Sequence, residues 1–357
     1  MIVLLALATL LIFATITSFI EPIHIHIFAF TGFFYPLFWI LNIGALIFLL
    51  ARRRWVLTLI PIFAVIITIN SWNSVFQFSK KEKEISEMEE PIKIISYNTR
   101  MFDYYKYSGM DGAPDVIFDA LLKENADIIC FQEYFTTLAK EPYKPNSILA
   151  KFRHYKYKHI EYLHTRKGNT GYGLAIFSKY PIANSGAIRF EKSNNLSQFS
   201  DITVNNKKIR LFNNHLESIG FKEDELSVLD SLDFRMTPYQ KEGLRNISNK
   251  LNRAFSLRSK QAEAISRHIK NSPYPVIVCG DFNDTPVSYT YRKMKKGLRD
   301  AFIESGSGFS GTFNGQLPSF RIDYIFHDAK FNSYNYKRMD LEYSDHFPIM
   351  TTIDLGK

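Results

Sequence analysis

The chain has 357 residues, of which 46 % are hydrophobic, and its formal net charge at pH 7 is +9. This length exceeds that of a usual single domain, and the two cysteines have neither a C-x-x-C nor a zinc-ligand spacing, which argues against structural zinc. The positive charge is scattered, so it fits a polyanionic partner and equally a soluble basic surface.

The N-terminal end of the chain is strongly apolar. Its first segment holds 19 consecutive uncharged residues, about the length that crosses a hydrocarbon core about 30 Å thick. It lacks the basic start and the small-residue cleavage site of a signal peptide, so we interpret it as a retained helix. We predict an anchor of about three transmembrane helices within residues 1–79. The three apolar segments are residues 2–20, 30–51 and 55–72.

Arginine and tryptophan residues indicate how these helices are oriented. Arg52, Arg53 and Arg54 separate the second and third segments, and Trp39 and Trp72 mark positions typical of a membrane interface, as does Trp55. Short loops rich in arginine stay in the cytoplasm. We therefore predict a multi-pass protein of the cell membrane whose soluble domain is periplasmic or extracellular.

Residues 80–91 differ from the segments on either side. Lysine and glutamate alternate here without apolar periodicity, and the stretch ends at Pro91. This composition predicts a solvated linker or a short helix.

From residue 92 onward, short β-branched and aromatic runs predict strands, and two stretches show helical spacing. Proline near the start of one of these stretches suits a first helical turn. The pattern predicts one mixed α/β domain over residues 92–357. The predicted strands are residues 92–97, 127–132, 173–178, 208–213, 276–279, 322–326 and 349–353, and the predicted helices are residues 114–123 and 257–269. Each of the two cysteines, Cys130 and Cys279, ends an apolar run and is expected to be a buried free thiol, with a disulfide between them as the alternative if their strands are adjacent.

Polar residues that can bind a metal ion or transfer a proton stand at the strand ends. Any one of them has an ordinary explanation as a turn residue or a solvated strand end. Six such segments in one chain favour a common site, because rigid strands hold side chains more tightly than free loops. The segments are residues 97–98, 131–133, 212–215, 279–283, 321–323 and 344–346.

Together these segments resemble the endonuclease/exonuclease/phosphatase superfamily of deoxyribonuclease-I-like enzymes. The matching motifs occur in the family's order across residues 92–355, and GDFN followed by SDH is the most specific part. The resemblance implies a four-layered α/β sandwich, with two packed β-sheets flanked by helices, and hydrolysis of a phosphoester by water. The motifs are SYNTR (96–100), FQE (131–133), NNHLES (213–218), GDFND (280–284), RIDYIF (321–326) and SDHFP (344–348).

The resemblance also implies a divalent cation, Mg²⁺ or alternatively Mn²⁺. Glu133 resembles the principal metal ligand, Asn98 lies beside it, and Asp345 is a further acidic residue near the ion. Oxygen ligands of this kind suit a hard cation.

The resemblance implies catalytic roles for five further residues. Asp281 resembles the residue that positions or deprotonates the attacking water, and Asn283 helps to hold the phosphate. His215 and His346 resemble the paired histidines that contact the phosphate, and Asp323 resembles the carboxylate that orients His346. A cation and two imidazoles on one phosphate would stabilise the charge that develops during hydrolysis.

Two departures from the family pattern affect the substrate. Family nucleases that cut at abasic sites have tyrosine where this chain has His215, so the chain is nearer to the deoxyribonuclease and sphingomyelinase pattern. The insertion over residues 219–256 is long enough to cover the site, although a surface insertion with one or two helices is the ordinary alternative.

The expected function is hydrolysis of a phosphoester bond in a nucleic acid, a phospholipid or a sugar phosphate. The alternative is a non-catalytic, membrane-tethered binding module with the same fold. The presence of all eight expected site residues favours the enzyme. We predict contact with the membrane through the N-terminal helices and no protein partner.

Overall fold

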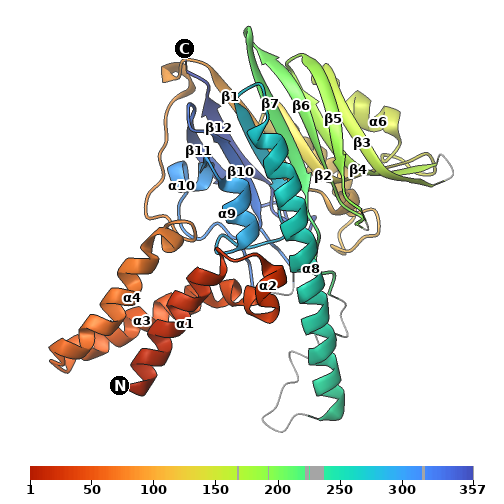
Figure 1. The fold of residues 1–357 in the computed structure, drawn as a ribbon. Helices are drawn as coiled ribbons and strands as arrows, with labels where there is room; N and C mark the ends of the chain where they lie inside the picture. The colour runs from red at the N-terminus through yellow and green to blue at the C-terminus, as the bar shows by residue number, and fades with distance from the viewer. Residues whose placement is uncertain (167–168, 192, 222–224, 226–236, 316–317, 357) are drawn as a thin grey trace. The chain divides into compact units, whose positions relative to one another are not determined.

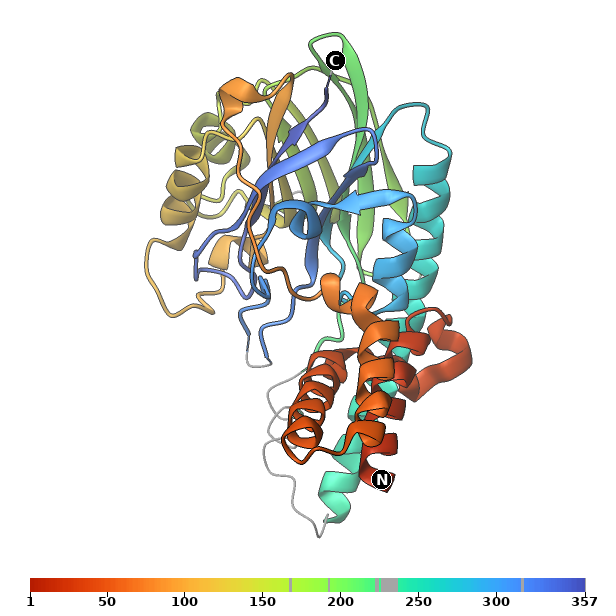
Figure 2. The same ribbon diagram turned by 90° about the vertical axis from the view of Figure 1, so that its left-hand side faces the viewer.

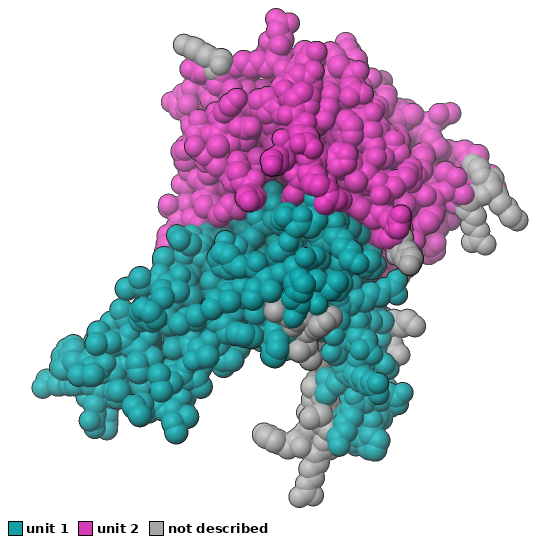
Figure 3. Space-filling view, in the orientation of Figure 1, with its two compact units in different colours: residues 1–75, 217–263, 283–294 teal, residues 76–216, 264–282, 295–357 magenta. Residues whose placement is uncertain are grey.

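The computed structural model describes the chain except for residues 167–168, 192, 222–224, 226–236, 316–317 and 357 (Figure 1). The described residues form two compact units, coloured separately in Figure 3. The first unit comprises Met1–Val75, Glu217–Glu263 and Asn283–Met294, and the second comprises Phe76–Leu216, Ala264–Phe282 and Lys295–Lys357.

The second unit contains two six-stranded β-sheets (Figure 1). In the first sheet the strand order is β11-β12-β1-β2-β4-β3, and only β1 and β2 run parallel. Its strands are β1 (Pro91–Asn98), β2 (Ile128–Thr137), β3 (Tyr157–Arg166), β4 (Thr170–Ser178), β11 (Asn332–Arg338) and β12 (Ile349–Asp354).

The second sheet has the order β5-β6-β7-β8-β10-β9, and only β7 and β8 run parallel. Both sheets are therefore mixed, and each has one parallel pair near its centre. The strands of this sheet are β5 (Ile182–Arg189), β6 (Leu196–Val204), β7 (Lys207–His215), β8 (Val276–Asp281), β9 (Leu298–Asp300) and β10 (Asp323–Asp328).

A layer of aliphatic side chains joins the two sheets. Ile94 and Ile128 of the first sheet belong to the same buried cluster as Leu211 and Ile277 of the second. Such a layer is the main stabilising contact of a sandwich, because the apolar inner faces of both sheets are removed from contact with water. The two cysteines lie in this layer, and both are buried and free, which confirms the prediction.

Helices cover the outer face of the first sheet. Helix α5 (Ala113–Lys123) and helix α6 (Pro145–Lys151) share a second, aromatic-rich cluster with Phe131 and Phe177 of the sheet. Figure 2 shows both helices on the same side of this sheet. Each helix has proline in its first turn, where the missing N–H needs no partner. Two packed sheets flanked by helices confirm the predicted fold class.

All seven predicted strands are present, but five strands were not predicted. The missed strands β3 and β5 lie at sheet edges, and β5 has the sequence IANSGAIR, with only one fully buried position. An edge strand can be polar because one side of it faces solvent, so its sequence lacks a clear apolar alternation. The short strand β9 and the bulged strand β11 carry similarly weak signals.

The charged linker contains a short 3₁₀ segment, Ile85–Glu87, and it is attached to the second unit. The side chain of Asn335 accepts a hydrogen bond from the Lys83 amide at 3.0 Å and donates one to the Lys83 carbonyl at 2.8 Å. Lys81 also lies over the ring of Tyr334, at 4.5 Å from its centroid. The linker is therefore held along β11.

The N-terminal helices of the first unit pack against one another. The hydroxyl of Tyr35 donates to the carbonyl of Thr68 at 2.7 Å, and the amide of Asn42 donates to the carbonyl of Leu7 at 3.0 Å. The helical segments of this unit are α1 (Ile2–Thr17), α2 (Pro22–Ile25), η1 (His26–Phe34), α3 (Tyr35–Ala51), α4 (Trp55–Asn73), most of α8 (Pro238–Lys270) and most of α9 (Tyr289–Lys295).

Two described helical segments, not three, are long and apolar enough to cross a membrane. They are Phe28–Ala51, with 24 residues, and Trp55–Asn73, with 19 residues. Helix α1 ends after 16 residues, where Thr17 and Ser18 bond back to the backbone of its last turn. Trp39 and Trp72 stack on each other at 3.8 Å, so Trp72 is buried instead of facing a membrane interface.

The predicted helix over residues 257–269 lies inside α8, which is much longer and begins at Pro238. The predicted insertion over residues 219–256 is described only in part. Residues 222–224 and 226–236 lie outside the described residues, and the first turns of α8 make up much of the remainder.

Candidate active site

The ends of the two parallel strand pairs carry three of the eight predicted site residues. Asn98 ends β1, His215 ends β7 and Asp281 ends β8. In the second sheet Asp281 pairs with His215 on one side and with Asp323 on the other. Because the carboxyl ends of parallel strands meet at the same sheet edge, residues from distant parts of the sequence are brought together.

Asp281 lies at the centre of this cluster and is fully buried. Its Oδ2 atom accepts a hydrogen bond from the amide of Asn98 at 3.0 Å. The Nε2 atoms of His215 and His346 lie 3.7 Å and 3.6 Å from the same oxygen. The Nε2 atom of His215 is also 3.8 Å from Oε1 of Glu133, so both sheets contribute to one site.

Asp323 holds His346 from behind. The Nδ1–H of His346 donates to Oδ2 of Asp323 at 2.9 Å, which leaves Nε2 directed at Asp281. Burial opposes a charge on His346, but Asp323 and Asp281 outweigh burial and raise its pKa well above the ordinary value. Asp323 therefore orients the imidazole of His346, and the two carboxylates favour its protonated form.

Glu133 reaches the site through a distortion of β2. The pairing of β2 with β4 shifts register between Phe131 and Tyr134, and Glu133 has φ of +52°. Such a bulge re-aims a side chain, and a positive φ at a residue with a side chain is a strain typical of functional positions. Burial, with Asp345 nearby, raises the pKa of Glu133 to about 7. Burial also raises the pKa of Asp281, although His346 and His215 act in the opposite direction.

Asp345 borders the cluster and pairs with a residue that sequence reasoning missed. Its Oδ2 lies 3.5 Å from Nε of Arg100, which is two residues after Asn98. Arg100, Met101, Phe102 and Asp103 all have positive φ, a rare run for residues with side chains. The arginine of the SYNTR motif was the available signal for this position.

Two asparagines that precede His215 have a structural role that sequence reasoning did not assign. Asn213 accepts from the amide of Gln132 at 2.6 Å and donates to the carbonyl of Phe131 at 3.0 Å, so it links β7 to β2 of the other sheet. Asn214 donates to the carbonyl of Cys279 at 2.7 Å. Two adjacent amides at the end of an apolar strand were the signal, because buried amides must find partners.

Asn283 follows Asp281 by two residues but belongs to the first compact unit. It is half-buried and has φ of +53°. Seven of the eight predicted residues lie in one cluster; they are Asn98, Glu133, His215, Asp281, Asp323, Asp345 and His346.

The donor groups of the cluster fit a divalent cation. Burial, together with the nearby carboxylates of Asp345 and Asp281, raises the pKa of Glu133. Donor atoms of Asp281, Asp323 and His346 also lie within 4.8 Å of one another, although His346 could be a ligand only in its deprotonated form. Oδ1 of Asp323 is buried without a hydrogen-bond partner among the described residues. A hard cation would neutralise this repulsion, since carboxylate oxygens are its preferred ligands.

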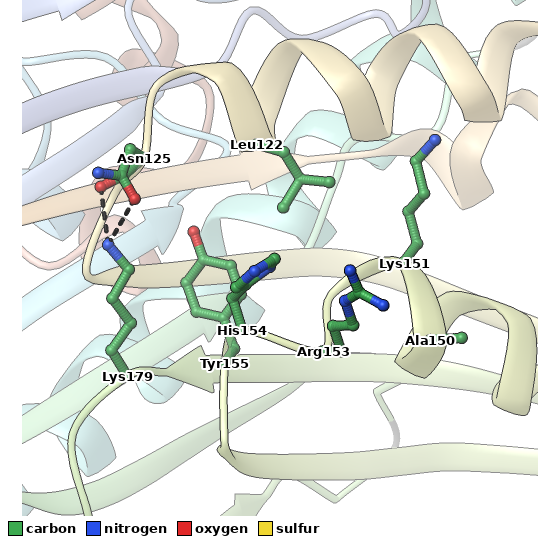
Figure 4. Close-up of a pocket in the computed structure, with 8 residues that line it drawn as sticks. All are labelled: Leu122, Asn125, Ala150, Lys151, Arg153, His154, Tyr155 and Lys179. Carbon is green, nitrogen blue, oxygen red and sulfur yellow. Dashed lines mark hydrogen bonds between the residues drawn. The ribbon is translucent and has the colours of Figure 1, made fainter.

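A separate pocket of about 440 Å³ lies at the other end of the first sheet. Asn125 precedes β2 and Lys179 follows β4, at one end of their pairing, whereas Glu133 lies at the register shift in the middle of that pairing. Figure 4 shows Lys179 bonded to the carbonyl and side chain of Asn125, and Lys151 pairs with Asp119. The pocket lining contains no carboxylate, so this cavity lacks the chemistry of the strand-end cluster.

Comparisons with known proteins agree with this geometry. A model of the Endonuclease/Exonuclease/phosphatase family matches residues 95–346, and a domain of unknown function (DUF8431) matches residues 1–75. No curated protein matches.

Several solved structures have the same fold. An endonuclease/exonuclease/phosphatase from Beutenbergia cavernae matches with a TM-score of 0.54 and 15 % identity, over 75 % of this chain and 72 % of that chain. D. rerio TDP2, humanized by 14 mutations, matches with a TM-score of 0.50 and 18 % identity, over 74 % and 99 % of the two chains. The human Nocturnin catalytic domain, with bound sulfate, has the same TM-score of 0.50 and identity of 18 %, over 74 % and 93 %.

Proposed function

The chain belongs to the Endonuclease/Exonuclease/phosphatase family, whose members are in general phosphoester hydrolases, and we propose that it is a divalent-metal-dependent enzyme of this kind. The observation that carries the proposal is the position of Asp281. Its carboxylate lies between the amide of Asn98 and two histidines, one of which is held by Asp323.

Asn98, Glu133 and Asp345 would hold the cation, Mg²⁺ or Mn²⁺. When bound, the ion would polarise the phosphoester and offset negative charge on it. A cation here would also lower the pKa of Glu133, so that its carboxylate is ionised at neutral pH.

The other site residues have separate catalytic roles in the proposed reaction. Asp281 accepts the proton of the attacking water and positions it, a role that its hydrogen bond from Asn98 supports. His346, kept protonated by Asp323, donates from Nε2 to a non-bridging oxygen of the phosphate, and His215 faces the same place. Asn283 would provide a further contact to the phosphate.

The N-terminal helices support a location at the cell membrane. We propose that residues 1–79 form a multi-pass anchor, that residues 80–91 link it to the enzyme, and that residues 92–357 carry catalysis outside the cytoplasm. A tethered enzyme meets lipid phosphates at high effective concentration, whereas a net charge of +9 favours nucleic acid equally. The substrate is thus a phospholipid, a sugar phosphate or a nucleic acid.

The test is a substrate panel with the full chain in detergent and in vesicles. DNA, RNA, sphingomyelin, phosphoinositides, sugar phosphates and bis(p-nitrophenyl) phosphate are assayed with Mg²⁺, with Mn²⁺ and with a chelator. We expect metal-dependent hydrolysis of at least one substrate, and its loss in D281N. Saturable binding of a phosphoester without any turnover would support the alternative, a non-catalytic binding module.

A further inference from the structure

Arg258 is the largest side chain that is completely buried among the described residues. It lies on α8 and belongs to the first compact unit. A buried guanidinium is expensive unless its charge and its donors are matched, so its partners indicate what it does.

One partner of Arg258 is the peptide backbone at Glu217. The Nη1 atom of Arg258 donates to the carbonyl of Glu217 at 2.9 Å. One turn later on the helix, Oε1 of Gln261 accepts from the amide of Glu217, also at 2.9 Å. Side chains of helix α8 therefore bond to both the backbone N–H and the backbone C=O of Glu217, as a neighbouring strand would.

The second partner is Asp284, which is 3 % exposed. The Nε atom of Arg258 lies 3.4 Å from Oδ2 of Asp284, an ion pair and not a well-aligned hydrogen bond. Burial raises the pKa of Asp284, and Arg258 acts against this shift and favours the carboxylate. The guanidinium also lies 4.7 Å from the ring centroid of Phe255, which covers it from one side.

Both partners of Arg258 lie only a few residues after a proposed catalytic residue. Glu217 follows His215 by two residues, and Asp284 follows Asp281 by three and is next to Asn283. The amide of Leu216 donates to the carbonyl of Asp281 at 3.0 Å, so the two segments are already paired where they leave the strands. Arg258 joins the same two segments again, immediately beyond that bond.

We infer that Arg258 is a positioning residue for the proposed hydrolysis. It holds the segment after His215 and the segment after Asp281 in one arrangement, and it acts on the substrate only through them. The inference rests on the proposed function, because that function assigns His215 and Asp281 to catalysis.

Arginine is suited to this role for a geometric reason. Its planar fork presents donors in fixed directions, so one group can serve a carbonyl and a carboxylate together. A lysine ammonium keeps the charge but ends at a single point. R258K should therefore keep the ion pair with Asp284 or the bond to Glu217, but not both.

The experiment compares R258M, R258K and the double variant R258M/D284L with wild-type full chain and with R253M. Arg253 is an exposed arginine of the same helix and is the matched control. Turnover and KM are measured on the panel substrate that the wild type cleaves fastest, together with thermal unfolding. Hydrogen exchange is followed over residues 213–217 and 281–284.

We expect turnover of R258M to fall about 100-fold, the order of loss that a misplacement near 1 Å produces, with a much smaller change in KM. In R258M, backbone hydrogen exchange should become faster over residues 213–217 and 281–284. R258M/D284L removes the unpaired charge and should regain stability, because a buried ion pair is often replaceable by apolar groups, but not turnover. R253M should match the wild type.

Several results would overturn the inference. One is near wild-type turnover in folded R258M; another is recovery of both stability and turnover in R258M/D284L, which would make the pair only structural. If R258M does not fold, R258K provides the test. Turnover and hydrogen exchange in R258K that equal those of the wild type would contradict a positioning role for Arg258. A wild type that hydrolyses no panel substrate refutes the proposed function instead, and the exchange data then still test Arg258.

Discussion

At the scale of single residues, the cluster is a site where carboxylates are held close together in a buried environment. Glu133 has its pKa raised to about 7 by burial and by Asp345, and burial raises the pKa of Asp281 as well. Buried carboxylates with raised pKa values destabilise a fold and are concentrated at functional sites, so these shifts indicate a functional site.

Glu133 should make the metal-free protein less stable as the pH rises. Between its ordinary pKa of 4.5 and about 7, the folded protein binds a proton that the unfolded chain has lost. Stability therefore decreases across this pH window, by up to about 3 kcal/mol. In E133Q this decrease should disappear, so that E133Q with chelator unfolds at a higher temperature than wild type at pH 8. Equal pH profiles of thermal unfolding for the two proteins would contradict the shift.

The same substitution should weaken metal binding. A neutral amide is a poorer ligand for a hard cation, so E133Q should need more Mg²⁺ for half-maximal activity. In the wild type the required Mg²⁺ concentration should rise as the pH falls below about 7, because a proton competes for Glu133. Titrations of activity with Mg²⁺ between pH 6 and 8 measure both effects.

Asp281 should affect turnover and not the metal requirement. D281N keeps the shape but loses the basic oxygen, so we expect turnover to fall about 10²- to 10⁴-fold at an unchanged Mg²⁺ requirement. H346A should lose a comparable factor, and D323N less, because it only loosens the imidazole. Recovery of D281N by added Mg²⁺ would instead assign Asp281 to metal binding.

At the scale of elements, the site depends on how β7 and β8 end side by side. Gly280 has φ of +132°, and a Cβ atom there would lie 2.0 Å from the carbonyl oxygen of Asn214. Glycine is thus required for the close approach of the two strands, one residue before Asp281.

We expect G280A to disrupt the site and the sheet together. The backbone clash and the positive φ should cost at least about 2 kcal/mol, and activity should be lost with the pairing of His215 and Asp281. The control is G297A, since Gly297 has φ of +80° but nothing within 4 Å of a Cβ atom, so it isolates the conformational cost of about 1 kcal/mol. Similar unfolding temperatures for the two variants would show that the clash relaxes.

At the scale of the whole molecule, two of the helical segments that the structure describes are long and apolar enough to cross a membrane, and Arg52–Arg54 separate them. A positively charged short loop is retained in the cytoplasm, so the chain after residue 73 should lie on the other side.

This orientation leads to a prediction about topology. Reporter fusions at residue 85 should be active with a reporter that works only outside the cytoplasm, and inactive with one that works only inside. Replacing the three arginines by serine should reduce this bias, because it removes the charges that hold the loop inside. Fusions that are active only in the cytoplasm would place the site there.

The sequence by itself determined the features that depend on neighbouring residues. The apolar N-terminal segments, seven of the eight inner strands and the polar residues at the ends of these seven follow from local composition and periodicity. The order of the motifs was sufficient to identify the family.

Only the tertiary structure decided the features that depend on residues far apart in the chain. The edge strands β3 and β5 exist because partners pair with them, and their own polar sequences do not require it. The raised pKa of Glu133 and the burial of Arg258 arise from groups that folding brings near, and a sequence does not specify their distances. Helix α1 ends after 16 residues, where the hydroxyl groups of Thr17 and Ser18 bond to carbonyls of its last turn, a detail of hydrogen bonding that apolar composition does not reveal.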